Sequence, residues 1–426
     1  MALTSRWCRS STPVGLVLGL GGQGGDSSST ASLSREQVFV LAAATVAALA
    51  TTTALASKLY RRQRTSPRDD LMELASAALR PESQSSIAAR RVIEERAQRI
   101  AAKVKAARIP ATQDEQLKML DLTPSRRFDP VAEADAWLEH LDREGYVVLA
   151  SVLTKQDCMT GDGLLWNFLE ANSSWRRSQP ETWSDDSFGN IGSIHNGLVK
   201  GAGIGHSDFL WFVRTRPAVR QAFERIWNTS ELLVSFDGAN VFRPWHHGFA
   251  KTVCGWWHTD QGAGRVGRQA VQGLVSIYAA NARTGGLTVV PQSHLRHREV
   301  VEDQQNPSVD YCTVRSYEPL MQELPQKLVT CEAGDLILWD SRLVHANAPA
   351  PQEPVGPADR LLRAVAYVCM VPQAFASSAI REGRRAAYEH GFVTSHWPQK
   401  LDLGPGPAGV KRSLAEASED VRALVG

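Results

Sequence analysis

The chain has 426 residues, of which 43% are hydrophobic and 22% are charged, so its composition is that of a globular protein with a substantial core. Its net charge of +2 gives no general reason to expect binding to nucleic acid. The six cysteines are scattered and form no CxxC pair, which argues against a thiolate zinc site and against a disulfide framework. The length suggests one large domain with extensions, or two modest domains.

The N-terminal part has the composition of a targeting or membrane segment. Residues 1–36 are rich in Ser, Thr and Gly, which is typical of a disordered or organelle-targeting segment. The run VFVLAAATVAALATTTALAS at 38–57 has no charge and is long enough to cross a bilayer, and four basic residues follow it between 58 and 64. We therefore predict a membrane-spanning helix at 37–58, with the rest of the chain on the cytosolic side. The alternative is removal of this part on import into an organelle.

Residues 59–128 are predicted to form a basic helical linker. They carry Ala, Arg and Glu at densities typical of helices, with Pro81 as a breaker. Between 61 and 110 there are 12 Arg and Lys against 6 Asp and Glu. Contact with anionic lipid head groups would explain this charge, but a solvated helix explains it more simply.

The main folded domain is predicted at 129–398, followed by a polar tail at 399–426. Near its start, EADAWLEHLDREGYVVLASVL reads as an amphipathic helix and then a strand. Many short β-rich runs follow, separated by Gly and Pro, which is typical of a sandwich or barrel. We expect a mainly β domain with flanking helices, of the α+β class.

The segment GWWHTDQGAG contains a candidate metal site. His258 and Asp260 are two positions apart, so both side chains would point to one face of a strand. His345 stands 87 residues later, just after the predicted strand of GDLILWDSRLVHANAP. Either histidine alone would more simply be a hydrogen-bonded core residue. Together the three form a two-histidine, one-carboxylate set, which leaves positions open on one face of an iron ion.

The chain resembles the phytanoyl-CoA dioxygenase-like family of Fe(II)- and 2-oxoglutarate-dependent oxygenases over roughly residues 129–375. The resemblance rests on six segments in family order, which are EGYVVL, SFDGANVFRPW, WWHTDQ, GGLTVVPQSH, GDLILWDSRLVH and RAVAYVCMVP. It implies a double-stranded β-helix, a jelly-roll barrel whose mouth holds Fe(II). It also implies 2-oxoglutarate and O2 as co-substrates.

In this family an arginine on a late strand binds the carboxylate of 2-oxoglutarate that is remote from the keto group, here called the far carboxylate. Arg363 is the matching residue. Arg360 is the alternative, but Arg363 joins the apolar strand directly. The gap from His345 to Arg363 exceeds the family's usual one, and the loop PAPQEPVGPAD at 349–359 accounts for the excess.

Other candidates have a structural explanation of equal weight. Lys200 lies where relatives have a lysine that contributes to 2-oxoglutarate binding, but it could equally be a solvated loop residue. Gln272 is predicted to contact the co-substrate, and Gln261 could reach it too, although both could instead satisfy backbone groups. His294 and His297 are interpreted as surface or turn-capping residues rather than as ligands of a second metal.

The resemblance implies an oxygenase that hydroxylates a small or lipid-like organic substrate and releases succinate and CO2. Halogenation is not expected, because Asp260 occupies the position that a halide would need. Two alternatives stay open at this point. One is a membrane-tethered jelly-roll binding module without turnover, and the other is a cupin-like metal enzyme that does not use 2-oxoglutarate.

Overall fold

The computed structural model describes residues 84–110, 112–302, 309–403 and 412–426. All of the described residues belong to one compact unit. The targeting segment predicted at 1–36 and the membrane helix predicted at 37–58 lie outside the described residues. Among the helices of the described part, none has the length and apolar character needed to span a bilayer.

The larger of two β-sheets has eight strands. In spatial order they are β1 (Arg127–Phe128), β2 (Tyr146–Leu149), β11 (Leu336–Asp340), β7 (Val271–Ser276), β13 (Arg363–Pro372), β5 (Ala239–Phe242) and β3 (Leu198–Val199), with β4 (Leu232–Val234) also paired to β13. Only the β1–β2 pair is parallel among these strands. The central strands β7 and β11 are buried along their whole length, as their runs of Val, Leu and Ile require.

The smaller sheet is antiparallel and faces the larger one. Its order is β10 (Lys327–Leu328), β8 (Gly286–Val289), β12 (His345–Ala348), β6 (His258–Thr259) and β9 (Cys312–Thr313). Side chains of both sheets meet in one buried cluster, in which Val148 and Ile337 of the larger sheet lie with Leu287 and Val289 of the smaller. Two packed sheets around a shared interior are the arrangement of a jelly roll.

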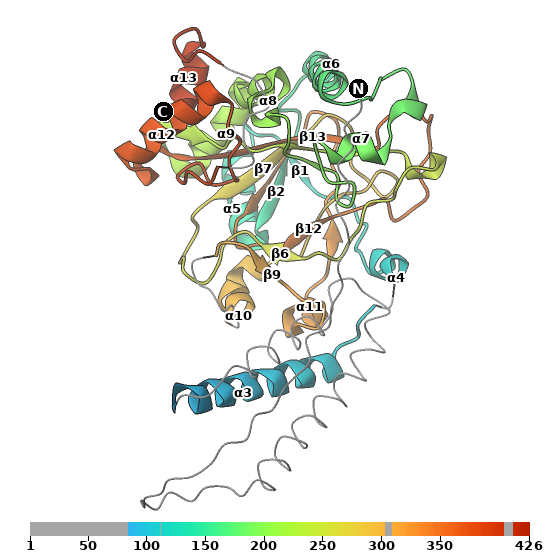
Figure 1. The fold of residues 1–426 in the computed structure, drawn as a ribbon, viewed down its shortest axis with the longest axis vertical. Helices are drawn as coiled ribbons and strands as arrows, with labels where there is room; N and C mark the ends of the chain where they lie inside the picture. Colours follow the sequence, from blue (N-terminus) through green and yellow to red (C-terminus); the bar gives the residue numbers. More distant parts are fainter. Residues whose placement is uncertain (1–83, 111, 303–308, 404–411) are drawn as a thin grey trace, which may run out of the picture. The chain divides into compact units, whose positions relative to one another are not determined.

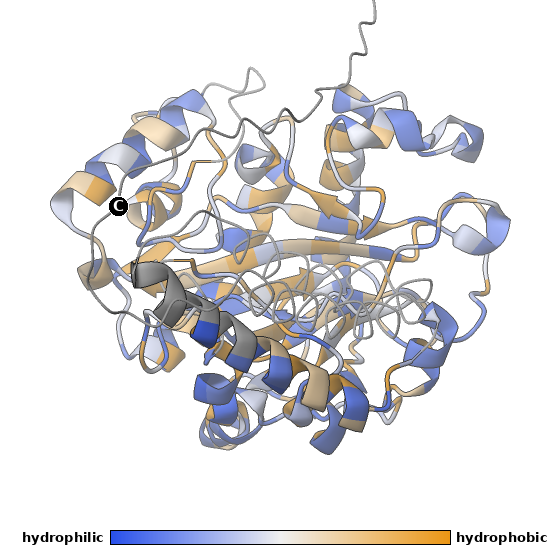
Figure 2. Cartoon of the chain, turned by 60° about the horizontal axis from the view of Figure 1, so that its bottom comes forward, coloured by the Kyte–Doolittle hydropathy of each residue, from blue (hydrophilic) through white to orange (hydrophobic). Residues whose placement is uncertain are grey.

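Helices fill most of the connections and cover the outside of the larger sheet. The described α-helices are α3 (Gln84–Ala106), α4 (Gln113–Lys118), α5 (Ala134–Glu144), α6 (Lys155–Asn172), α7 (Asp185–Gly189), α8 (Asp208–Arg214), α9 (Pro217–Trp227), α10 (His297–Val301), α11 (Pro319–Glu323), α12 (Ser378–His390) and α13 (Glu419–Val425). Helices α6, α8, α9, α12 and α13 gather on one side of the strands (Figure 1). Figure 2 shows that hydrophobic residues dominate the strands, whereas the helices carry both classes of residue.

The expectation of a mainly β domain is corrected by these helices. Among the described residues more lie in helices than in strands, because several strands have only two to four residues, so the fold is mixed α and β. Local sequence signals explain where individual helices begin and end. The side chain of Thr154 and that of Asp157 form a capping box at the start of α6. Gly145 ends α5 in the left-handed region, with φ of 81°.

Segments on both sides of the predicted domain 129–398 pack against it. Before residue 129, β1 pairs with β2, and the Arg127 guanidinium donates two hydrogen bonds to the buried carboxylate of Asp335, at 2.7 and 2.8 Å. After residue 398, α13 buries Leu424 and Val425, and Arg384 donates to the Val425 carbonyl at 3.0 Å. These flanking segments are short, so their apolar residues give no periodic signal that would mark them as part of the core.

Candidate active site

The three predicted metal ligands come together between β6 and β12. His258 and His345 are directly opposite each other in this antiparallel pair, and their ring centroids are 4.3 Å apart. The Asp260 carboxylate lies 3.1 Å from Nε2 of His345 and 3.6 Å from Nε2 of His258. One ligand atom from each residue lies within 4.8 Å of the other two. All three residues are buried, with exposed fractions of 5% to 7%.

The backbone fixes which imidazole nitrogen of each histidine faces the carboxylate. Nδ1 of His258 donates to the carbonyl of Trp256 at 3.2 Å, and Nδ1 of His345 donates to the carbonyl of Leu343 at 2.9 Å. With Nδ1 carrying the proton, Nε2 of each ring presents a lone pair. Because both lone pairs point towards Asp260, the set has the donor atoms that a divalent metal requires.

The protonation states suit a metal site. Burial, together with repulsion from His345, lowers the pKa of His258 to about 3, so this imidazole is neutral at pH 7. Burial opposes ionisation of Asp260, but His396 and His258 outweigh it and hold the pKa of this carboxyl well below its usual value. The neutral imidazole of His258 and the ionised carboxylate of Asp260 are therefore ready to bind a cation without first losing protons.

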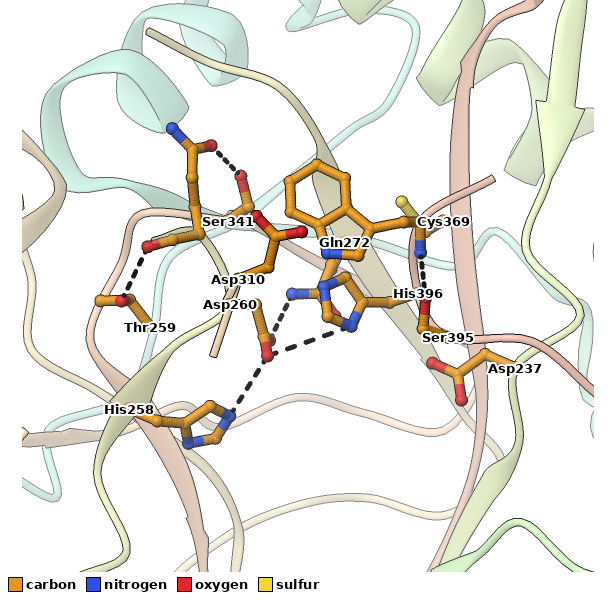
Figure 3. A network of polar contacts seen from close by, with 12 residues as sticks. Asp237, His258, Thr259, Asp260, Gln272, Asp310, Ser341, Cys369, Ser395 and His396 are labelled. Atoms are coloured by element: carbon orange, nitrogen blue, oxygen red, sulfur yellow. Dashed lines mark hydrogen bonds and ion pairs between the residues drawn. The ribbon is translucent and has the colours of Figure 1, made fainter. Parts of the chain in front are cut away.

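Two further side chains approach Asp260 from the protein. Nε2 of Gln272, on β7, donates to Oδ2 of Asp260 at 2.6 Å, and Nδ1 of His396 lies 3.9 Å from Oδ1 (Figure 3). Gln272 therefore touches the candidate metal ligand, although the sequence suggested a contact with the co-substrate. His396 was missed, because VTSHWPQK lies outside the strands and resembles no motif. Its Nε2 is buried and has no hydrogen-bond partner.

Aromatic rings hold the plane of the His258 imidazole. Trp256 stacks on this ring at a centroid distance of 5.1 Å, and Tyr311 stacks on it at 4.7 Å. Trp257, in contrast, is buried in a core cluster behind the small sheet. One tryptophan of the pair therefore supports the site and the other supports packing.

Arg363 presents an open guanidinium edge at the start of β13. Only 2% of the residue is exposed, and Nη1 donates to Oδ1 of Asn240 at 2.8 Å. Its Nε and Nη2 are buried without a partner, and such unpaired donors cost about 1–3 kcal/mol each. These two N–H groups form the fork that binds a carboxylate through two parallel bonds. Arg360 is exposed instead, with its guanidinium over the ring of Tyr278 at 5.2 Å.

Lys200, which follows β3, faces the same region as the candidate ligands. The nearby carboxylate of Asp237 raises the pKa of Lys200, and Asp260 and Tyr367 act in the same direction. The charge of Lys200 therefore interacts with the carboxylates of Asp237 and Asp260, and the residue as a whole is exposed. This position would allow Lys200 to attract an anionic ligand.

Three other candidates are satisfied by local hydrogen bonds. Gln261 donates to the Gly267 carbonyl at 2.8 Å and accepts from the Ser341 hydroxyl at 2.8 Å, so its amide is engaged within the protein. Nε2 of His294 contacts the backbone carbonyl of Asp142 at 2.9 Å, and Nε2 of His297 contacts that of Gln261 at 2.6 Å. Both histidines are buried and bond to backbone carbonyls distant in sequence, so they are core residues, and the expectation of surface or turn-capping histidines is wrong.

Comparison with known proteins gives a family match and several similar proteins. Residues 141–350 match the family model described as phytanoyl-CoA dioxygenase. Ava biosynthesis cluster protein O of Aspergillus versicolor is 23% identical over 295 residues, which cover 64% of this chain and 89% of that protein. The non-haem α-ketoglutarate-dependent carbocyclase SnoK of nogalamycin biosynthesis is 16% identical, with a TM-score of 0.42 and coverage of 58% of this chain and 87% of that one. The epimerase SnoN, solved with Fe3+ and α-ketoglutarate, is 20% identical, with a TM-score of 0.39 and coverage of 57% and 85%.

Proposed function

Because this chain belongs to the phytanoyl-CoA dioxygenase-like family of Fe(II)- and 2-oxoglutarate-dependent oxygenases, we propose that it hydroxylates a small or lipid-like organic substrate. The products from the co-substrate would be succinate and CO2. One observation carries the proposal, which is that a buried two-histidine, one-carboxylate set and a buried arginine with an open fork occur in the same domain. The residues present therefore fit both the metal and the co-substrate.

His258, Asp260 and His345 would hold Fe(II), and Arg363 would hold the far carboxylate of 2-oxoglutarate. Once bound, iron and 2-oxoglutarate supply the oxidation of a C–H bond by O2, which no protein side chain can perform. The chain contributes binding and orientation. The two imidazoles and the buried carboxylate would bind the cation, and the Arg363 guanidinium would set the direction in which the co-substrate enters.

The neighbouring groups would keep this arrangement rigid. The hydrogen bond from Gln272 limits rotation of the Asp260 carboxylate, so one orientation of its oxygens is favoured. The rings of Trp256 and Tyr311 stack on the imidazole of His258 and would limit its rotation. Lys200 would add positive charge at the entrance, which favours the doubly charged co-substrate over neutral keto compounds.

Release of succinate from 2-oxoglutarate tests the proposal. The purified chain should form succinate only with Fe(II), and the rate should rise with the right compound in a screen of lipids, acyl-CoAs and small metabolites. A binding module would retain a compound from the screen without forming succinate. A cupin-like enzyme would convert a compound in a metal-dependent way without consuming 2-oxoglutarate. Either of the last two results would replace the proposal.

We also propose that residues 38–57 anchor the enzyme in a membrane, with the catalytic domain on the cytosolic side. This proposal rests on the uncharged run and on the basic residues between 58 and 64. An Ala-rich span buries less apolar area than a Leu-rich one, so its insertion should be marginal. The competing account is import into an organelle after cleavage of the N-terminal part.

A further inference from the structure

The imidazole of His396 approaches Asp260 from a segment that belongs to neither sheet. His396 lies between α12 and α13, beyond the end of the family match at residue 350. Its Nδ1 is 3.9 Å from Oδ1 of Asp260, and the two groups face each other in Figure 3. His396 is not among the three residues whose ligand atoms lie within 4.8 Å of one another, so it stands beside the candidate metal set and not in it.

The backbone on both sides of this imidazole is fixed to the domain. The N–H of Thr394 donates to the Phe236 carbonyl at 3.0 Å, and the N–H of Phe236 donates to the Thr394 hydroxyl at 3.0 Å. Further along, Arg384 donates to the Pro398 carbonyl at 2.9 Å. Trp397 lies between these contacts and is 1% exposed. Because both flanks are held, the imidazole has a defined place relative to the candidate metal ligand.

The two ring nitrogens of His396 have different surroundings. Nδ1 faces a carboxylate, whereas Nε2 is buried and has no hydrogen-bond partner among the described residues. A neutral imidazole carries its proton on one nitrogen and a lone pair on the other. A lone pair on Nδ1 would face the negative charge of Asp260, so we assign the proton to Nδ1. The unpaired Nε2 then costs about 1–3 kcal/mol, which a charge-assisted bond from Nδ1 to the carboxylate can offset.

The two oxygens of the Asp260 carboxylate have separate neighbours. Oδ2 accepts a hydrogen bond from Nε2 of Gln272 at 2.6 Å, and Oδ1 faces Nδ1 of His396. An N–H···O bond is about 2.7–3.2 Å long, so Oδ1 must move by about 1 Å to complete the second contact. A small rotation about the Cβ–Cγ bond achieves this, because that torsion of an aspartate is soft. A carboxylate held at one oxygen can pivot, whereas one held at both cannot.

We propose that His396 is a positioning residue for Asp260, whose Nδ1–H donates to Oδ1 once a cation is bound, so that His396 and Gln272 together hold both oxygens. The inference rests on the proposed function, because it requires a metal at this site. A carboxylate held in this way cannot turn to bind the cation through both oxygens, which keeps the other positions open for the co-substrate and O2. The candidate site would then include a C-terminal residue outside the family match.

Titration of the full chain with Co(II), followed by visible absorption without O2 or co-substrate, tests this role. His396→Phe keeps a ring beside Trp397, at present 5.3 Å away between centroids, and removes both nitrogens. It should weaken Co(II) binding by about 10- to 100-fold, the usual cost of losing a group that orients a metal ligand. His396→Asn loses the ring but places an amide N–H where Nδ1 stood, so it should restore most of the affinity and the wild-type shape of the Co(II) band. A role in packing alone predicts the reverse order of the two variants.

Two further variants complete the experiment. His396→Gln carries its amide one bond further from the backbone, at the place of Nε2, so it should lose affinity as His396→Phe does. This variant also tests the proposal if His396→Phe does not fold. His390→Phe makes the same ring substitution at an exposed histidine at the end of α12 and should leave the Co(II) affinity unchanged.

Three outcomes would overturn the inference. Wild-type affinity for Co(II) in both His396→Phe and His396→Gln would show that Nδ1 does not act on Asp260, while the metal site itself would stand. A loss in His396→Asn as large as that in His396→Phe would show an effect of ring packing. Failure of the wild type itself to bind Co(II) would remove the proposed function as well, and this result is recognised without any variant.

Discussion

Replacing Arg363 by Lys tests the proposed co-substrate site most directly, because the change keeps the charge and removes the fork. In the protein, Nη1 of Arg363 is occupied by Asn240, while Nε and Nη2 point into the interior without partners. A lysine ammonium is a single point of charge at the end of a flexible stem, so it cannot offer two parallel N–H groups to one carboxylate. The variant should therefore bind 2-oxoglutarate with the right sign of charge but with one strong hydrogen bond fewer.

The size of the effect follows from the burial of the site. A hydrogen bond to a charged group contributes about 1.5–3 kcal/mol, and the full value applies because Arg363 is only 2% exposed and water cannot replace the lost bond. Since about 1.4 kcal/mol corresponds to a factor of ten, the loss is roughly 10- to 150-fold in affinity. The lysine would also leave Oδ1 of Asn240 without its donor, which adds to the cost of folding more than to the cost of binding.

The measurement is the Michaelis constant for 2-oxoglutarate in succinate release, together with its dissociation constant in the absence of O2. Arg360→Lys is the matched control, because Arg360 is exposed and lies over Tyr278. It should leave both constants within about twofold of the wild type, as expected of a surface change. A large effect of the Arg360 variant with none of the Arg363 variant would refute the reasoning and would assign binding of the 2-oxoglutarate carboxylate to Arg360.

Four further predictions concern the metal ligands, their support, acid stability and placement. His258→Ala and Asp260→Ala should each abolish stoichiometric Fe(II) binding, measured by metal content, while circular dichroism stays native; wild-type turnover in both variants would disprove the assignment. Gln272→Leu should weaken Co(II) binding by about 10- to 100-fold, the usual cost of losing a group that orients a metal ligand. If only the affinity for 2-oxoglutarate changed, Gln272 would instead be assigned to co-substrate binding. Burial lowers the pKa of His206 to about 3. Its contribution to stability is therefore complete above pH 6.5 and is lost as the pH falls towards 3, by up to about 1.4 kcal/mol per pH unit. Urea unfolding between pH 7 and pH 4 should show a shallower loss for His206→Phe, and parallel curves would refute this. Carbonate extraction of cells that express the full chain should leave uncleaved protein in the membrane pellet, whereas soluble protein that starts beyond residue 57 would rule out the anchor.

The gathering of His258, Asp260 and His345 could be predicted from the sequence because its constraint is mostly local. Residues at i and i+2 of an extended segment lie on the same side, so the His258–Asp260 pair needs little knowledge of the fold, although β6 ends at Thr259 and Asp260 follows it. His345 needed one further assumption, that the strand after GDLILWD lies beside the first, and the structure pairs His345 with His258 directly. Arg363 was preferred over Arg360 because it directly joins the apolar run of β13, and only Arg363 is buried.

The contacts that depend on sheet register could not be predicted in this way. Gln272 reaches Asp260 because β7 lies between β11 and β13, and this order follows from pairings of Gln272 with Trp339 and Cys369, which are 67 and 97 residues away in sequence. Neither Asn240 nor His396 carries a local signal, since an isolated Asn or His on an apolar or irregular segment fits many environments. Long-range packing decides which polar side chains come into contact, and the composition of the sequence does not reveal these contacts.

The division of the site between two sheets has an energetic consequence. The candidate metal ligands belong to or follow strands of the smaller sheet, whereas Arg363, Asn240 and Gln272 belong to the larger one. Without a ligand, the free N–H groups of Arg363 oppose close packing at this boundary, because a buried charge with unpaired donors is unfavourable. A bound dicarboxylate would neutralise that charge and bridge from the larger sheet to the metal on the smaller. Binding of the co-substrate should therefore stabilise the contact between the two sheets, in addition to placing the co-substrate for reaction.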